Sequence, residues 1–137
     1  MGSEMCIRDR LQANLLKERK ANYQAQQSKM SETAAKLRAN LATNRHDQQL
    51  ISSRLRSLKE IEAMQEKMVA QKYGAPMQLL EAQARSKEVE RDLQLASSRE
   101  QEIMREMAAF SAEKLAFEKG WRQKLMEETL SLSLIHI

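Results

Sequence analysis

The sequence contains almost nothing that ends a helix or crosslinks a fold. Its 137 residues include one proline, three glycines and one cysteine. A single cysteine cannot form a disulfide within the chain, so a small disulfide framework and a thiolate zinc site are both excluded. Between Leu11 and Ser131 the only helix breakers are Gly74, Pro76 and Gly120. Long helices are therefore expected.

Aromatic residues and long apolar runs are equally scarce. The chain has two tyrosines, two phenylalanines and one tryptophan, too few large side chains for a sizeable globular core. No apolar run approaches the roughly 20 residues that span a bilayer. Alanine, glutamate, lysine, leucine, arginine and glutamine are abundant instead, which is the composition of long helices or a coiled coil. The predicted fold class is all-α.

Charge of either sign is spread rather than clustered. Lysine and arginine number 23 against 19 acidic residues, so the net charge is +4. Basic and acidic residues alternate, as in Glu81 and Arg85, whose spacing and order suit an exposed helical ion pair. This pattern indicates a solvated helix surface. We expect no nucleic-acid partner.

Both ends of the chain resemble translated sequencing adaptor. The N-terminal MGSEMCIRDR matches the reading GTG GGC TCG GAG ATG TGT ATA AGA GAC AG of a transposase adaptor, with GTG as the start. The C-terminal LSLIHI matches the opposite strand of the same DNA, CTG TCT CTT ATA CAC ATC. Residues 1–10 and 132–137 are thus interpreted as artefacts and set aside before fold reasoning. The alternative is a natural N-terminal arm and a short apolar tail.

This interpretation limits what the ends can contribute. Cys6 and His136 carry no redox or metal argument, and LSLIHI is not a membrane anchor. The genuine segment is expected to be Leu11 to Ser131, cut from a longer protein at both ends.

One stretch, QKYGAPMQ, interrupts the helical pattern. Gly74 is expected to adopt the left-handed conformation that ends a helix, and Pro76 suits the first turn of the next helix. The prediction is a first helix over 11–72, a turn over 73–76 and a second helix over 77–131. Each helix would be roughly 85–90 Å long at about 1.5 Å per residue.

Apolar residues recur at steps of three and four in both predicted helices. A repeat near 3.5 residues predicts a left-handed coiled coil. We therefore predict a long antiparallel two-helix coiled-coil hairpin; the alternative is a continuous rod that dimerises, with Gly74 and Pro76 as a kink. The first-helix seam is predicted to comprise Tyr23, Gln27, Met30, Ala34, Leu37, Leu41, Asn44, Gln48, Ile51, Leu55 and Leu58. The second-helix seam is predicted to comprise Val89, Leu93, Ala96, Glu100, Ile103, Met107, Phe110, Lys114, Phe117 and Trp121.

Near the turn the apolar residues fall out of step with this seam. After Leu58 they shift to Ile61, Met64 and Met68, which predicts an irregularity in the heptads. Met64 and Met68 are expected to fill the seam; the alternative is a pliable docking surface. Tyr73, at the tip, is a plausible contact residue.

No catalytic constellation is present. His46 and Asp47 are adjacent, and neighbouring residues on a helix point in different directions, so they do not form a base and its orienting acid. The carboxylates match no metal-ligand spacing, and no glycine-rich phosphate loop occurs. We expect no enzyme activity, no metal and no cofactor. Gly120 either allows a neighbouring helix to approach closely or is a glycine that the helix tolerates without a special role.

Three stretches give the chain a family resemblance: EKMVAQKYGAPMQLLEAQ around the turn, ERDL after it, and AFEKGWRQKLMEE in the second helix. They resemble the hairpin of HlyD-like membrane fusion proteins, the periplasmic subunits of type I secretion and related export systems. Leu79 to Ala82 match the family's helix start, and the run from Phe117 to Leu125 matches its Trp-Arg motif. The chain departs from the family's tip pattern of Arg-x3-Leu-x6-Ser at Met64 and Ala75, and only the apolar middle position, Met68, agrees with it.

The resemblance implies a periplasmic protein that links an inner-membrane ABC transporter to a TolC-like outer-membrane channel. It also implies a homo-oligomeric ring and a membrane anchor outside this segment. The residues expected to contact a partner at the hairpin tip are Met64, Met68, Lys72, Tyr73, Gly74, Ala75 and Pro76. The alternative function is a cytosolic coiled-coil scaffold.

Overall fold

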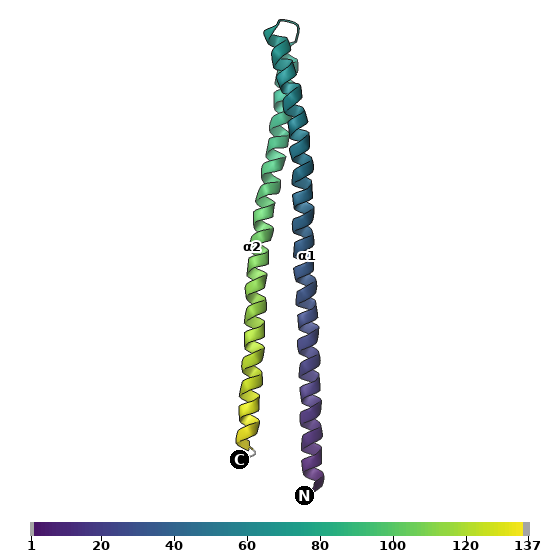
Figure 1. Cartoon of the computed structure of the whole chain (residues 1–137), viewed down its shortest axis with the longest axis vertical. Coiled ribbons are helices and arrows are strands. Elements are labelled where there is room, and N and C mark those ends of the chain that lie inside the picture. The colour runs from purple at the N-terminus through teal and green to yellow at the C-terminus, as the bar shows by residue number, and fades with distance from the viewer. Residues whose placement is uncertain (1, 136–137) are drawn as a thin grey trace. The chain divides into compact units, whose positions relative to one another are not determined.

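The described part of the chain forms two α-helices that pack against each other. The computed structural model describes residues 2–135, so His136 and Ile137 of the suspected C-terminal artefact lie outside the described residues. Helix α1 spans Gly2–Ala70 and helix α2 spans Pro76–Ile135, and residues 71–75 join them (Figure 1). Residues 2–135 contain no strand. The all-α prediction is confirmed, and the alternative of one continuous rod does not fit two helices that pack together.

The chain divides into two compact units, each built from a piece of both helices. Unit 1 comprises Met1–Lys36 and Ala108–Ile137, and unit 2 comprises Leu37–Met107. The suspected artefact over residues 2–10 continues α1, and residues 132–135 continue α2.

Aromatic stacking joins the helices of unit 1. The Tyr23 ring lies 5.7 Å from the Phe117 ring and 5.0 Å from the Trp121 ring, centroid to centroid, with interplanar angles of 9° and 24°. Each such pair contributes about 0.5–1.5 kcal/mol beyond its buried area. One turn earlier in α1, Arg19 forms an ion pair with Glu128. Moving forward along α1 therefore means moving backward along α2.

Unit 2 holds the most deeply buried side chains. Val89 and Ile103 are 4% and 2% exposed, and Ser86 is fully buried. Arg45 forms an ion pair with Glu100, and Lys59, about four turns nearer the end of α1, pairs with Glu90. The same reversed order of contacts thus holds in this unit.

The predicted seam is confirmed in both helices up to Leu58. Every predicted position from Tyr23 to Leu58 is half-buried, and every predicted position from Val89 to Trp121 is half-buried or buried. The polar members follow the same rule, since Gln27 and Lys114 are half-buried too. Helical geometry, with its steps of three and four, decides which positions face the neighbouring helix.

The predicted shift of the seam after Leu58 is wrong. Ile61, Met64 and Met68 remain 48%, 63% and 41% exposed. The steps of three and four continue instead through Glu62, Gln65 and Val69, which are all half-buried. Because α1 is one uninterrupted helix, it keeps its facing positions even where they are polar, and the apolar residues are left outside.

The end of α1 is a Schellman motif, and the left-handed residue in it is Lys72. Its φ is 63°, whereas no glycine among the described residues has a positive φ, so the prediction for Gly74 is wrong. The Tyr73 N–H donates to the Met68 carbonyl at 2.9 Å, and the Lys72 N–H donates to the Val69 carbonyl at 3.0 Å. These are the two bonds that define the motif. A side chain in this conformation costs about 1–2 kcal/mol.

Gly74 is required for a different reason, the close approach of its backbone to α1. Its N–H donates to the Met68 carbonyl at 3.1 Å. A Cβ atom at Gly74 would lie 2.9 Å from the Met68 Cβ, closer than real Cβ atoms come. The glycine therefore lets the chain turn tightly against the last turn of α1.

The start of α2 agrees with the sequence to within one residue. Pro76 is the first helical residue, where its missing N–H leaves no bond unmade. The Gln78 N–H donates to the Ala75 carbonyl at 3.1 Å. Ala75 has no side-chain oxygen to cap the helix, so the proline provides the main local start signal.

Substituting the two glycines with alanine should change stability in opposite directions. Gly74→Ala is expected to destabilise the fold by about 1–3 kcal/mol because the added methyl overpacks against Met68. Gly120→Ala is the matched control, since nothing lies within 4 Å of a Cβ there, and it should stabilise the fold by about 0.5–1 kcal/mol. Urea denaturation followed by circular dichroism measures both. Equal effects of the two substitutions would contradict this account of the turn.

Candidate functional site

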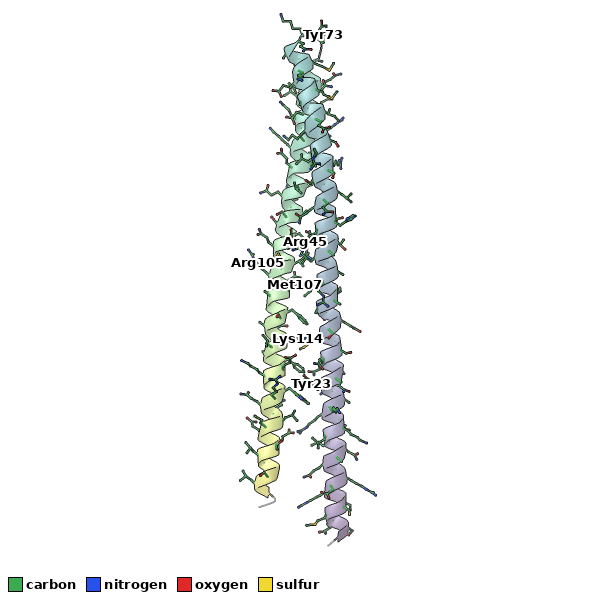
Figure 2. The ribbon with its side chains drawn as sticks, viewed as in Figure 1. Tyr23, Arg45, Tyr73, Arg105, Met107 and Lys114 are labelled. Carbon is green, nitrogen blue, oxygen red and sulfur yellow. The ribbon has the colours of Figure 1, made fainter. Side chains whose placement is uncertain are left out.

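The residues predicted to contact a partner gather at and beside the turn of unit 2. Tyr73, in the segment between the helices, is 83% exposed (Figure 2). Lys72, Ala75 and Pro76 are also exposed, and Gly74 is half-buried. The turn therefore presents an aromatic ring to solvent on a backbone held by the Schellman hydrogen bonds.

A row of exposed apolar side chains runs along α1 toward this turn. We call it the outer stripe; it consists of Ile61, Met64 and Met68, spaced by three and four residues. Such spacing places the three side chains on one side of a helix. The sequence predicted Met64 and Met68 as site residues but missed Ile61 as their neighbour. The signal was available, because extending the seam unchanged past Leu58 leaves all three residues outside.

The seam beneath the outer stripe is polar. Glu62, Gln65 and Ser86 each have a buried side-chain oxygen that lacks a hydrogen-bond partner among the described residues. Lys59 lies 3.5 Å from that Glu62 oxygen, without hydrogen-bond geometry, and 2.9 Å from a Glu90 oxygen. An unsatisfied buried polar group costs about 1–3 kcal/mol. The seam next to the turn therefore encloses polar side chains, whereas the apolar side chains of Val89 and Ile103 are buried farther along α2.

A groove of about 150 Å³ lies between the helices beside the outer stripe. Ile61 contributes to its wall. The groove is lined by Leu58, Ile61 and Gln65 of α1 and by Gln78, Glu81, Ala82 and Arg85 of α2. An apolar side chain from outside could enter at Ile61, with Glu81 and Arg85 at its margin.

A second polar feature of unit 2 is fully connected. Asn44 Nδ2 donates to the Ala96 carbonyl at 3.0 Å, across the two helices. Gln48 Nε2 donates to Asn44 Oδ1 at 2.6 Å and to Glu100 Oε2 at 2.7 Å. Arg45 Nε donates to the other Glu100 oxygen at 2.9 Å (Arg45 is labelled in Figure 2). We call these four side chains the polar cluster.

The polar cluster can fix the register of α1 against α2 within unit 2. Its hydrogen bonds need particular partners, so sliding one helix past the other would leave Asn44 and Gln48 without theirs. A polar residue at a seam position commonly fixes register in this way, with some loss of stability. The Arg45 and Gln48 hydrogen bonds hold the pKa of the Glu100 carboxyl below its usual range.

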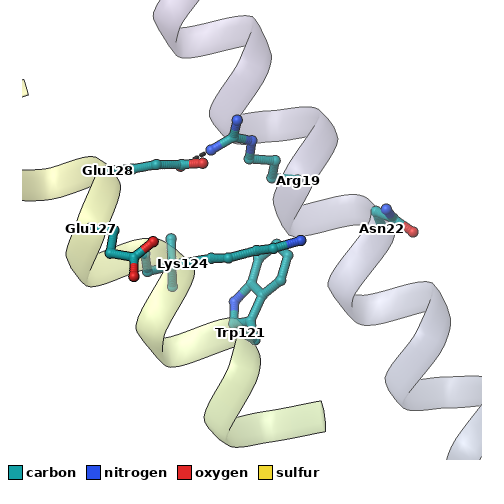
Figure 3. A pocket seen from close by; sticks show the side chains of 7 residues that line it. Arg19, Asn22, Trp121, Lys124, Glu127 and Glu128 are labelled. Carbon is teal, nitrogen blue, oxygen red and sulfur yellow. Dashed lines mark ion pairs between the residues drawn. The ribbon is translucent and has the colours of Figure 1, made fainter. Parts of the chain in front are cut away.

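Unit 1 has a groove of about 450 Å³ between its helices, next to the aromatic stack. Figure 3 shows Arg19 and Glu128 joined across it, with Trp121 and Lys124 projecting from α2. Its wall carries charges of both signs, because Lys124 is accompanied by Glu127 and Glu128. The mixture does not favour a ligand of either charge.

Potential metal ligands do not gather in one place in the part of the chain that the structure describes. Over residues 2–135, no group of three or more potential ligands from histidine, cysteine and acidic residues could hold a metal ion. His46 and Asp47 are both exposed. Cys6 is exposed and forms no disulfide.

No family model, no curated protein and no solved structure matches this chain. Over residues 2–135, no helix combines the length and apolar character needed to cross a membrane.

Lowering the pH should weaken the fold through Glu100. Because its folded-state pKa is lowered, the ionised carboxylate stabilises the folded chain above its ordinary pKa, and that contribution is lost as the pH falls through the folded pKa. Urea denaturation at a series of pH values, from about pH 6 to pH 3, measures the loss. Glu100→Gln should flatten this dependence. The matched control is Glu102→Gln, which removes an exposed α2 carboxylate paired with Arg99; an equal flattening there would contradict the assignment.

Proposed function

We propose that α1 and α2 form one antiparallel coiled-coil hairpin, and that this hairpin belongs to an HlyD-like membrane fusion protein. The observation that carries the proposal is the seam, which follows steps of three and four in both helices. A repeat of 3.5 residues is the signature of left-handed supercoiling. The reversed order of contacts within each unit supports the antiparallel direction.

The family assignment rests on the sequence around the turn and near Trp121. In the structure, these same stretches carry the Schellman turn and the aromatic stack. A hairpin needs a sharp turn where the chain reverses and contacts that hold its two helices together away from the turn. The Schellman turn provides the first, and the aromatic stack provides the second. This agreement between motif and local structure supports the proposed family.

The proposed role is mechanical. A hairpin whose helices pair throughout would be a stiff spacer roughly 90 Å long. It would hold an inner-membrane ABC transporter and a TolC-like outer-membrane channel at a fixed separation in the periplasm. Several copies in a ring could line a conduit, and the ATPase partner would supply the energy for transport.

The turn is the proposed contact with the channel. Among the described residues, Tyr73 is the most exposed of the large apolar side chains, and the outer stripe adds Met64 and Met68. Methionine side chains adapt to differently shaped surfaces. Such a contact tolerates the departure from the usual tip pattern at Met64 and Ala75, because it depends on apolar area rather than on one specific hydrogen bond.

Spin labels at Arg38 and Ser111, in a Cys6→Ser background, test the hairpin. Both positions are exposed, so labels there leave the seam intact. Pairing throughout the helices predicts a separation of roughly 10–25 Å, given an interaxial distance of 8–10 Å. A continuous helix would separate the labels by about 110 Å. Double electron–electron resonance distinguishes the two, and a broad distribution at long distance would refute the hairpin.

The complete gene tests the export role separately. We expect a membrane-spanning segment upstream of Leu11, lipoyl-like sequence on both sides of the hairpin, and a neighbouring ABC transporter gene. The genomic codons should also differ from the adaptor-like ends. A complete gene with neither the membrane segment nor the lipoyl-like sequence would refute the export role and favour a cytosolic scaffold.

A further inference from the structure

The outer stripe leaves three large apolar side chains in contact with water. Ile61, Met64 and Met68 are 48%, 63% and 41% exposed, and they follow the steps of three and four that a helix uses to meet another helix. Exposed apolar groups gathered in one place commonly mark an interaction site. The stripe therefore has the spacing and exposure that a second helix-packing surface would need, and it is distinct from the seam with α2.

Two charges of opposite sign border the stripe. Glu60 precedes Ile61, and Lys67 precedes Met68, so they occupy equivalent places seven residues apart. Both are exposed, and neither forms an ion pair with another residue in the described part of the chain. In a helix pair, these bordering positions are the ones that choose partner and orientation.

We infer that a second copy of this chain covers the outer stripe, in an antiparallel arrangement whose two-fold axis passes between Glu62 and Ala63. In this arrangement Ile61 packs against the partner's Met64. Glu60 faces the partner's Lys67. Two-fold symmetry repeats each contact, so one stripe supplies two apolar layers and two ion pairs.

The bordering charges select this register over its neighbours. Moving one helix by a heptad in one direction places Lys67 against the partner's Lys67. Moving it by a heptad in the other direction places Glu60 against the partner's Glu60. A parallel pairing instead sets Glu60 beside the partner's Gln65, which offers no opposite charge. Opposite charges thus attract in the proposed register, whereas like charges repel in the registers shifted by one heptad. Helix pairs commonly gain specificity for one register in this way.

The groove beside Ile61 gives the partner's side chain a place to enter. It has a volume of about 150 Å³ and includes Leu58 and Ala82 in its wall. The partner's Met64 sits opposite Ile61 in the proposed register, and its flexible thioether can follow an irregular wall. Self-complementary charge, apolar spacing and the groove all point to a second copy as the occupant.

This inference concerns the chain itself and does not rest on the export function. It would hold equally for a scaffold protein. Where both are true, the self-paired form covers Met64 and Met68, which the proposed channel contact also uses.

Self-association of the full chain tests the pairing directly. Sedimentation equilibrium should show a monomer–dimer equilibrium, and Met64→Glu should weaken it about tenfold or more because it places a charge in the centre of the interface. Leu80→Glu is the matched control. Its side chain is 64% exposed in the same unit but lies outside the stripe, so the dissociation constant should not change.

Charge exchange tests the register. Glu60→Lys alone and Lys67→Glu alone should each weaken the dimer, because each sets like charges against one another. The double variant Glu60→Lys/Lys67→Glu should restore it. Circular dichroism checks that every variant keeps its helices. A double variant that is as weak as either single variant would overturn the proposed ion pairs.

A spin label at Gln49, in a Cys6→Ser background, tests the direction. The antiparallel register separates the two labels by about 40 Å along the helix axis, and a shift of one heptad changes this by about 10 Å. A parallel pair would give less than roughly 20 Å. A short distance, or a chain that stays monomeric at the highest soluble concentration, would overturn the inference, whereas neither result bears on the gene-context test of the export function.

Discussion

The structure depends on one constraint: each long helix must hide its narrow row of seam residues against the other. A helix of this length is not stable in water by propensity alone, and most of its stability comes from packing. Here the packing is thin, since Val89 and Ile103 are the only apolar side chains among the described residues that are buried rather than half-buried. Many small contacts, spread along both units, therefore replace a compact core.

Because the seam buries few apolar side chains, individual local contacts matter more to the stability of the helix pair. The Tyr23 stack in unit 1 and the polar cluster in unit 2 each tie α1 to α2 through partners that neither helix could find elsewhere. The aromatic stack supplies affinity, whereas the hydrogen bonds of Asn44 and Gln48 supply alignment. The turn adds a third contact between the segments, because Gly74 lets the backbone approach Met68 closely.

The spacing of residues made most of the seam predictable from the sequence. The last turns of α1 were not predictable, because the facing residues there, Glu62 and Gln65, are polar. From Tyr23 to Leu58 most of the facing positions are apolar, so counting steps of three and four located the packed face. Beyond Leu58 the two signals disagree, and following the apolar residues gave the wrong face. The left-handed residue could not be read from composition, since glycine is favoured there but Lys72 occupies it. In the structure, hydrogen bonds from Tyr73 and Gly74 to the Met68 carbonyl accompany the left-handed Lys72, and neither could be read from the residue types alone.

The mismatch near the turn has a physical consequence for contacts with other molecules. A seam that encloses Glu62 and Gln65 contributes little stability, while the apolar residues that would have strengthened it face outward. Burying exposed apolar area is favourable whichever molecule covers it. Ile61, Met64 and Met68 would therefore stabilise both the proposed self-pairing and the proposed partner contact. Because one surface cannot be covered twice, the two events compete. Any partner that docks on Met64 and Met68 must then bind more strongly than a second copy does at the prevailing concentration of the chain.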